Sequence, residues 1–166
     1  RPHLIALQDL HSGKLIAWRL ATSENKDVVL FPEKIGGRYV AMHRPNPSLW
    51  FSPPEMWISR SDDLMHWGEH RQFFGGHSDW SRGRIGAGTP PVRTDRGWLT
   101  IYHGNNKVPG SEEVGFYFGA ALLLDLMHPE RIIAHSNGPI LAPEALPETV
   151  KRLYVGLNPR VARADM

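Results

Sequence analysis

The chain has 166 residues, and its 19 Lys and Arg against 17 Asp and Glu give a net charge of +2, which argues against a general role in binding nucleic acid or other polyanions. It contains no cysteine, which excludes disulfides, thiol nucleophiles and cysteine-based zinc sites. No apolar stretch approaches the roughly 18 residues of a membrane span, while 16 glycines, 14 prolines and 6 tryptophans favour an all-β protein of short strands.

A β-hairpin is predicted early in the chain. Two apolar runs, 28–31 and 39–42, flank a Gly36-Gly37 pair, which is the pattern of two antiparallel strands around a tight turn. Antiparallel pairing brings the polar outer ends of the two runs together at one rim of the sheet, and we expect a ligand there. The residues at this rim are Lys26, Asp27, His43 and Arg44.

Short strands are also expected through the rest of the chain. Their ranges are 4–7, 15–20, 56–59, 70–74, 91–94, 98–103, 114–125, 131–134, 139–141 and 153–157. The glycine-rich stretch 75–88 is predicted to be a loop, and residues 61–67 a turn with a buried tryptophan. Short strands without a confident helix fit a sandwich, a barrel or a propeller, and recurring tryptophan-bearing turns favour the propeller. At about 40–50 residues per four-stranded blade, residues 1–166 are predicted to form one partial propeller domain of roughly three to four blades.

A series of motifs suggests a family. In chain order they are Asn25-Lys26-Asp27, Leu30-Phe31-Pro32-Glu33-Lys34, His43-Arg44-Pro45, Ser61 with His66-Trp67, Ile85-Gly86-Ala87-Gly88-Thr89-Pro90-Pro91, Gly97-Trp98-Leu99 with Tyr102-His103-Gly104, and Ala121-Leu122-Leu123-Leu124-Asp125. Together they resemble glycoside hydrolase family 130, the β-mannoside phosphorylases. The resemblance implies a five-bladed β-propeller with its active site at the mouth of the central channel. It also implies inverting phosphorolysis of a β-mannosyl oligosaccharide to α-mannose 1-phosphate.

The chemistry of the rim suits phosphate. Inverting hydrolysis needs two carboxyl groups, whereas attack by phosphate needs cations and hydrogen-bond donors that hold the anion. The predicted phosphate-binding residues are Lys26, Arg44, Tyr102 and His103, and the predicted substrate-binding residues are Asp27, His43 and Asp125. The resemblance implies that the general-acid aspartate lies upstream of Arg1, so the isolated chain is expected to be inactive. Inorganic phosphate is the expected co-substrate, with no other cofactor.

Two other functions stay open at this point. One is a related propeller glycosidase that uses water, with Asp27 or Glu33 as the base, and the other is a non-catalytic carbohydrate-binding propeller. Structural interpretations also exist for the site residues. Lys26 and Asp27 could form a surface ion pair, His43 and Arg44 could end a strand, Tyr102 and His103 could be half-buried sheet residues, and Asp125 could cap a turn.

Metal binding is not expected, because the spacing of His66, His70 and His77 would need a helix to converge on an ion. Gly86 and Gly88 do not form a phosphate loop and are predicted to let two backbones approach. The expected partners are a β-mannoside oligosaccharide and phosphate, with no nucleic acid and no membrane. A homo-oligomer is allowed by the open sheet edges, and a cytoplasmic location is favoured because phosphate is abundant there. The acceptor sugar and its linkage do not follow from the sequence.

Overall fold

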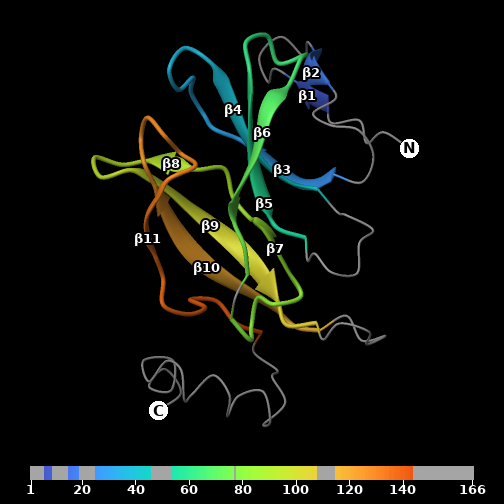
Figure 1. The fold of residues 1–166 in the computed structure, drawn as a ribbon, viewed down its shortest axis with the longest axis vertical. Coiled ribbons are helices and arrows are strands. Elements are labelled where there is room, and N and C mark those ends of the chain that lie inside the picture. The colour runs from blue at the N-terminus through green and yellow to red at the C-terminus, as the bar shows by residue number, and fades with distance from the viewer. Residues whose placement is uncertain are drawn as a thin grey trace.

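The computed structural model describes residues 6–8, 15–18, 25–45, 54–76, 78–107 and 115–143, and all regular structure in these ranges is β-strand (Figure 1). Strands β1 (Ala6–Gln8) and β2 (Leu15–Trp18) form an antiparallel pair of their own. The expected strand 153–157 lies outside the described residues. No helix in the described part of the chain is long and apolar enough to cross a membrane.

The first large sheet contains four antiparallel strands in chain order. They are β3 (Asn25–Leu30), β4 (Tyr39–Pro45), β5 (Met56–Ser61) and β6 (Gly68–Phe74). The hairpin predicted around the glycine pair is confirmed, because β3 pairs with β4. Gly36 and Gly37 have φ angles of 59° and 81°, which is the left-handed conformation that a two-residue hairpin turn requires and glycine adopts without steric cost.

The second large sheet has the order β11-β10-β9-β7, with β8 also pairing with β9. Its strands are β7 (Arg84–Ala87), β8 (Val92–Arg93), β9 (Trp98–Asn105), β10 (Tyr117–Leu124) and β11 (Ile132–His135). The prediction of a loop over 75–88 is wrong for residues 84–87. Gly86 made this stretch resemble a loop, since glycine is depleted in strands, but Ile85 is fully buried and β7 pairs with β9.

One apolar core fills the space between the two sheets. The first sheet contributes Val40, Met42, Met56 and Ile58, and the second contributes Ile85, Trp98, Phe118, Ala120, Leu122 and Leu124, among others. The sheets meet where β7 passes β3, β4 and β5 (Figure 1). The second sheet therefore packs its strand β7 against several strands of the first sheet, as neighbouring blades of a propeller do.

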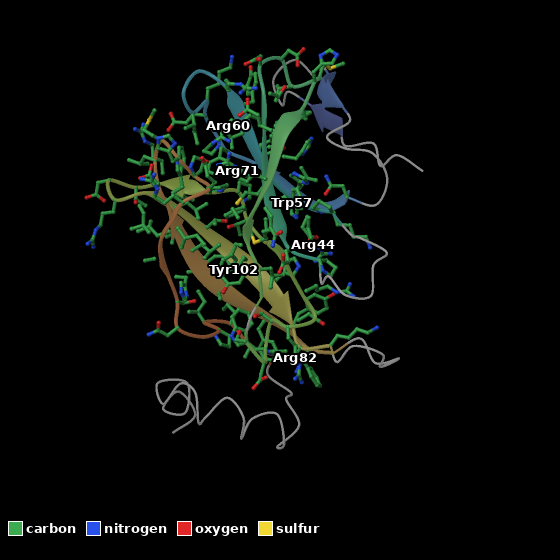
Figure 2. The ribbon with its side chains drawn as sticks, in the orientation of Figure 1. Arg44, Trp57, Arg60, Arg71, Arg82 and Tyr102 are labelled. Carbon is green, nitrogen blue, oxygen red and sulfur yellow. The ribbon has the colours of Figure 1, made fainter. Side chains whose placement is uncertain are left out.

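An ion pair also joins the sheets at one end of this junction. Arg60 Nη2 on β5 lies 2.6 Å from Glu130 Oε2 in the turn before β11, and both side chains are largely buried. Figure 2 shows Arg60 and Arg71 on the same part of the molecule, and Arg71 also lies near Glu130. Polar contacts thus fix the end of the junction that lies away from the predicted rim.

Candidate active site

The predicted rim forms where β3 and β4 pair. Lys26 lies directly opposite Arg44 in the antiparallel register. The register then shifts between Lys26 and Val29, and Asp27 has a φ of 52°. This is a β-bulge, which redirects a side chain from the regular alternation of the strand. Asp is one of the few residues besides glycine that is enriched in this left-handed conformation.

The bulge places the Asp27 carboxylate between nitrogen-bearing side chains from two sheets. Its Oδ2 atom lies 2.7 Å from Arg44 Nη1 on β4 and 3.3 Å from His103 Nε2 on β9. The Arg44 side chain is almost fully buried, with 4% exposed. Burial by itself raises the pKa of Asp27, but the His103 hydrogen bond and the charges of Arg44, His103 and Lys26 outweigh it, so the pKa is lowered. Asp27 is therefore an anion in the neutral pH range.

These distances are compatible with a proton on either nitrogen of His103, and the neighbouring charges distinguish the two arrangements. Arg44 Nη1 is 3.3 Å from His103 Nε2, but a guanidinium can only donate. If Nε2 were unprotonated, its lone pair would face the carboxylate of Asp27. Because the Asp27 carboxylate is negative, we assign the proton of His103 to Nε2, which faces it, and this assignment leaves Nδ1 as the atom available to a ligand.

A glycine makes room for this arrangement. Gly86 on β7 pairs with His103 on β9, and a Cβ atom at position 86 would lie 2.1 Å from Asp27 Oδ2 and 2.9 Å from His103 Cε1. The carboxylate thus occupies the space that any side chain at residue 86 would need. At Gly88 the expected approach of two backbones is found, since a Cβ there would lie 3.0 Å from the carbonyl oxygen of Ile101.

Two further residues, Arg84 and Tyr117, lie near this group, and the sequence analysis did not identify either of them. The pKa of Arg44 is lowered overall, chiefly by burial. Asp27 and Tyr117 raise this pKa, and the nearby Arg84 lowers it. The Tyr117 ring lies 5.7 Å from the His103 ring. Arg84 was assigned to a loop and Tyr117 to an apolar run. The sequence signal for Tyr117 was a hydroxyl-bearing residue at the start of a predicted strand. In the structure its side chain is half-exposed and its strand pairs with the strand of His103.

Unpartnered donors mark the group as incomplete. The Nε atoms of Arg44 and Arg84 are buried and have no hydrogen-bond partner among the described residues, and Asp27 Oδ2, although it is close to Arg44 and His103, also lacks a hydrogen bond of good geometry. Buried donors are nearly always satisfied, and an unsatisfied one is costly. The group also carries more positive than negative charge, because Lys26, Arg44 and Arg84 surround the carboxylate of Asp27. This electrostatic balance favours a bound anion with several acceptor oxygens.

The structure places Tyr102 away from this group, contrary to the expectation that it lies beside His103 at the site. Only 3% of Tyr102 is exposed. Its ring lies 5.0 Å from that of Phe74 and 5.7 Å from that of Trp80, between the two sheets (Figure 2). Burial raises the pKa of Tyr102 to about 12. Successive residues of a strand face opposite sides, so Tyr102 and His103 cannot both face the rim.

Asp125 is also placed elsewhere. It follows the end of β10 that pairs with Trp98, whereas His103 pairs with Gly119. Five strand positions separate Trp98 from His103, or about 17 Å at the rise of a β-strand. Asp125 Oδ1 accepts hydrogen bonds from the backbone amides of Met127 and His128 at 2.9 and 2.8 Å. This is the turn-capping role that its sequence position allowed.

His43 adjoins Arg44 in sequence but contacts other groups. Its Nδ1 lies 3.1 Å from Asn25 Oδ1 and its Nε2 lies 3.2 Å from His70 Nδ1. Burial and the charge of His70 lower its pKa to about 4. Glu33 lies beyond the opposite end of the hairpin, 3.2 Å from Arg93. Within the described ranges no three His, Asp or Glu side chains are grouped to hold a metal ion.

The family follows from a comparison with family models. Residues 10–156 match the model of the β-1,4-mannooligosaccharide phosphorylases, glycoside hydrolase family 130. The chain belongs to glycoside hydrolase family 130. The similarity that the sequence motifs indicated is thereby confirmed.

Relatives within family 130 include phosphorylases of different linkage. A β-1,2-mannobiose phosphorylase of Listeria innocua is 42% identical over 74% of this chain and 33% of its own length. A β-1,4-mannooligosaccharide phosphorylase of Ruminococcus albus is 38% identical over 76% of this chain and 37% of its own. The chain spans about a third to two fifths of the length of such curated relatives.

Solved structures agree on the fold. The Listeria innocua β-1,2-mannobiose phosphorylase, solved with β-1,2-mannobiose, matches with a TM-score of 0.72 and 35% identity over 87% of this chain and 39% of that one. A glycosyl hydrolase from Bacteroides ovatus matches with a TM-score of 0.60 at 17% identity, over 86% of this chain and 49% of that one, and supports the fold alone. Family 130 neighbours are five-bladed β-propellers, so this all-β chain is part of such a propeller.

Proposed function

We propose that the protein carrying this chain is a β-mannoside phosphorylase. Inorganic phosphate would attack the anomeric carbon of a β-mannosyl oligosaccharide with inversion, and the products would be α-mannose 1-phosphate and a sugar shortened by one unit. The observation that carries the proposal is that the Nε donors of Arg44 and of the nearby Arg84 are buried and lack hydrogen-bond partners among the described residues. Arginine is the side chain best suited to hold phosphate, because its planar fork meets two oxygens.

The relatives support the same substrates. Those named above are phosphorylases of β-1,2-mannobiose and of β-1,4-mannooligosaccharides, and one solved relative holds β-1,2-mannobiose. Because these relatives differ in linkage, the proposal covers β-mannosides as a class. A phosphorylase benefits from a compartment rich in phosphate, which favours the cytoplasm.

Neither of the two carboxylates considered as a base, Asp27 and Glu33, is free to activate water, and this favours phosphate as the nucleophile. A base that activates water needs a carboxylate free to take a proton. Asp27 has a lowered pKa and is occupied by Arg44 and His103, and Glu33 is paired with Arg93 at the far end of the hairpin. Phosphate is already an anion and needs no such base.

The general acid would come from another part of the protein. Among the described residues, Asp27 is the carboxylate that contacts the arginine and histidine of this group, and it is ionised. An acid that protonates a leaving oxygen requires a raised pKa. We therefore expect the 166-residue chain alone to show no turnover, while the full-length protein does. Turnover by the isolated chain would place the acid within it.

The test of the proposed function is phosphate dependence. The full-length protein is incubated with β-mannobiose of either linkage, with and without inorganic phosphate, and products are followed by ³¹P and ¹H NMR. We expect α-mannose 1-phosphate with phosphate and no sugar release without it. Mannose release at equal rates in both conditions would identify a hydrolase, and sugar binding without turnover would identify a binding protein.

A further inference from the structure

We propose that Asp27 is a positioning residue that orients Arg44 and His103 toward phosphate without touching the sugar, and that Gly86 provides the space its carboxylate needs. This inference rests on the proposed function, and it assigns Asp27 a role other than the substrate contact expected from the sequence. The role depends on contacts to two sheets, so it could not be derived from the hairpin alone.

The first argument is that Asp27 Oδ2 lies in close contact with side chains from both sheets. It lies 2.7 Å from Arg44 Nη1 and 3.3 Å from His103 Nε2. A carboxylate that lies against two donor side chains at once fixes the direction of both, and this leaves less of its acceptor capacity for sugar hydroxyls. With Nη1 held by Asp27, the unpartnered Nε of Arg44 is a donor still to be satisfied.

The second argument is that the backbone is shaped to deliver this carboxylate. Asp27 is in the left-handed region at a φ of 52°, within the bulge that separates Lys26 from Val29 in the register. A left-handed conformation in a non-glycine residue is unfavourable and persists when surrounding contacts require it. Here the surrounding contacts are the ion pair with Arg44 and the hydrogen bond from His103.

The third argument is the space at Gly86. A Cβ atom there would lie 2.1 Å from Asp27 Oδ2 and 2.9 Å from Asp27 Cγ. Because β7 is held by β9 on its other side, the strand cannot move away without losing its pairing. A side chain at residue 86 would therefore push the Asp27 carboxylate away from Arg44 and His103.

Replacing Asp27 by Asn separates three possible roles of Asp27, because each role predicts a different change in phosphate binding. If Asp27 only lowers the local positive charge, its removal strengthens phosphate binding. If Asp27 contacts the sugar, its removal weakens mannoside binding and leaves phosphate binding unchanged. If Asp27 positions Arg44 and His103, phosphate binding weakens even though the net positive charge has risen.

The experiment uses the full-length protein with Asp27→Asn and the matched control Asp79→Asn, an exposed aspartate near Arg82. Calorimetry measures the affinity for inorganic phosphate, and steady-state kinetics measures KM for phosphate and for mannoside separately. We expect Asp27→Asn to weaken phosphate binding about 10- to 100-fold, the range for a lost hydrogen bond to a charged group, while Asp79→Asn behaves as the unmodified protein. Stronger or unchanged phosphate binding in Asp27→Asn would overturn the proposal.

A second pair of variants tests the role of Gly86. Gly86→Ala should weaken phosphate binding as Asp27→Asn does, whereas Gly68→Ala, at a glycine with no atom within 4 Å of the added Cβ, should not. In an Asp27→Ala background the carboxylate is absent and the contact of the added Cβ with His103 Cε1 at 2.9 Å remains, so Gly86→Ala should cause a smaller loss than it does in the unmodified protein. Additive losses would show that residue 86 acts independently of Asp27 and would overturn this part of the proposal.

A third readout is independent of phosphorolysis. The ¹⁵N chemical shifts of the His103 ring report which nitrogen carries the proton. We expect a protonated Nε2 in the unmodified protein and altered ring shifts in Asp27→Asn. If the protein proved to be a hydrolase, the proposed function would fail, while these shifts would still test whether Asp27 orients His103. Unchanged shifts in Asp27→Asn would reject the positioning role in either case.

Discussion

Neighbouring residues of one strand have different surroundings in this protein. Arg44 contacts Asp27 and His103 at the junction of the two sheets, and His43 contacts Asn25 and His70. The sequence predicted that both residues lie near the rim, since the hairpin fixes where the strand ends. It could not predict which of Tyr102 and His103 faces the rim, because strand alternation allows either until the buried face is known.

The role of Arg84 is tested with the nearby Arg82, which is exposed and close to Asp79. Arg84→Ala should raise KM for phosphate about 10- to 100-fold, because it removes a charged donor from the anion, and it should change KM for mannoside little. Arg82→Ala should leave both constants unchanged. Equal effects of the two variants in steady-state kinetics would contradict the assignment of Arg84 to the site.

The buried His43 predicts a dependence of stability on pH. Its pKa is about 4 in the folded protein against a usual value of 6.5, so the unfolded chain takes up a proton first as the pH falls. Stability is thus unaffected above about pH 6.5 and decreases between 6.5 and 4, by about 2 kcal/mol at pH 5.

Chemical denaturation at pH 7 and pH 5 measures this contribution. His43→Gln should lose less stability than the unmodified protein between the two pH values. His135→Gln, at an exposed side chain, should lose as much as the unmodified protein. An identical loss in all three proteins would mean that His43 does not remain neutral on folding.

At the scale of elements, the strands that could be predicted from the sequence were those next to a recognisable turn. The Gly36-Gly37 pair identified the first hairpin because a two-residue turn with positive φ requires such residues. The strand β7 was missed because it is short and contains Gly86. Its reason to be a strand lies in its pairing with β9 and its contact with the first sheet, and these contacts join residues far apart in the sequence.

Another glycine shows how tightly the second sheet is packed. A Cβ atom on Gly104 in β9 would lie 2.5 Å from Trp80 Cζ3 and 2.7 Å from Ser81 Cβ. Gly104→Ala should therefore destabilise the protein by about 1–3 kcal/mol, the usual cost of overpacking a filled core. Thermal unfolding compared with Gly68→Ala measures this cost, and equal unfolding temperatures would show that Trp80 moves aside freely.

At the scale of the whole molecule, the second sheet presents apolar side chains to solvent. Val92 and Leu99, which pair directly across β8 and β9, are 63% and 41% exposed, and Leu141 is 61% exposed. In a propeller this face of a blade is covered by a neighbouring blade. The fold class followed from strand spacing and motifs, whereas this uncovered face required coordinates.

We therefore expect the 166-residue chain, produced alone, to self-associate through this face. Sedimentation velocity should show a concentration-dependent increase in size, and replacing both Val92 and Leu99 by Lys should reduce it. Lysine at the already exposed Met65, in the turn between β5 and β6, should not. A monomer at all concentrations would show that other residues of the chain cover the face.

The junction of the two sheets has a consequence for how the protein would lose its activity. Asp27 and Arg44 come from one sheet and Arg84 and His103 from the other, whereas the strand pairing of each sheet is internal to it, and a backbone hydrogen bond from Ile85 N to the carbonyl oxygen of Pro54 links β7 to the segment before β5. A small separation of the blades on warming would dismantle the anion site and leave the strands intact. Heat inactivation should accordingly precede the loss of the far-ultraviolet circular dichroism signal, and added phosphate should narrow the interval between the two temperatures.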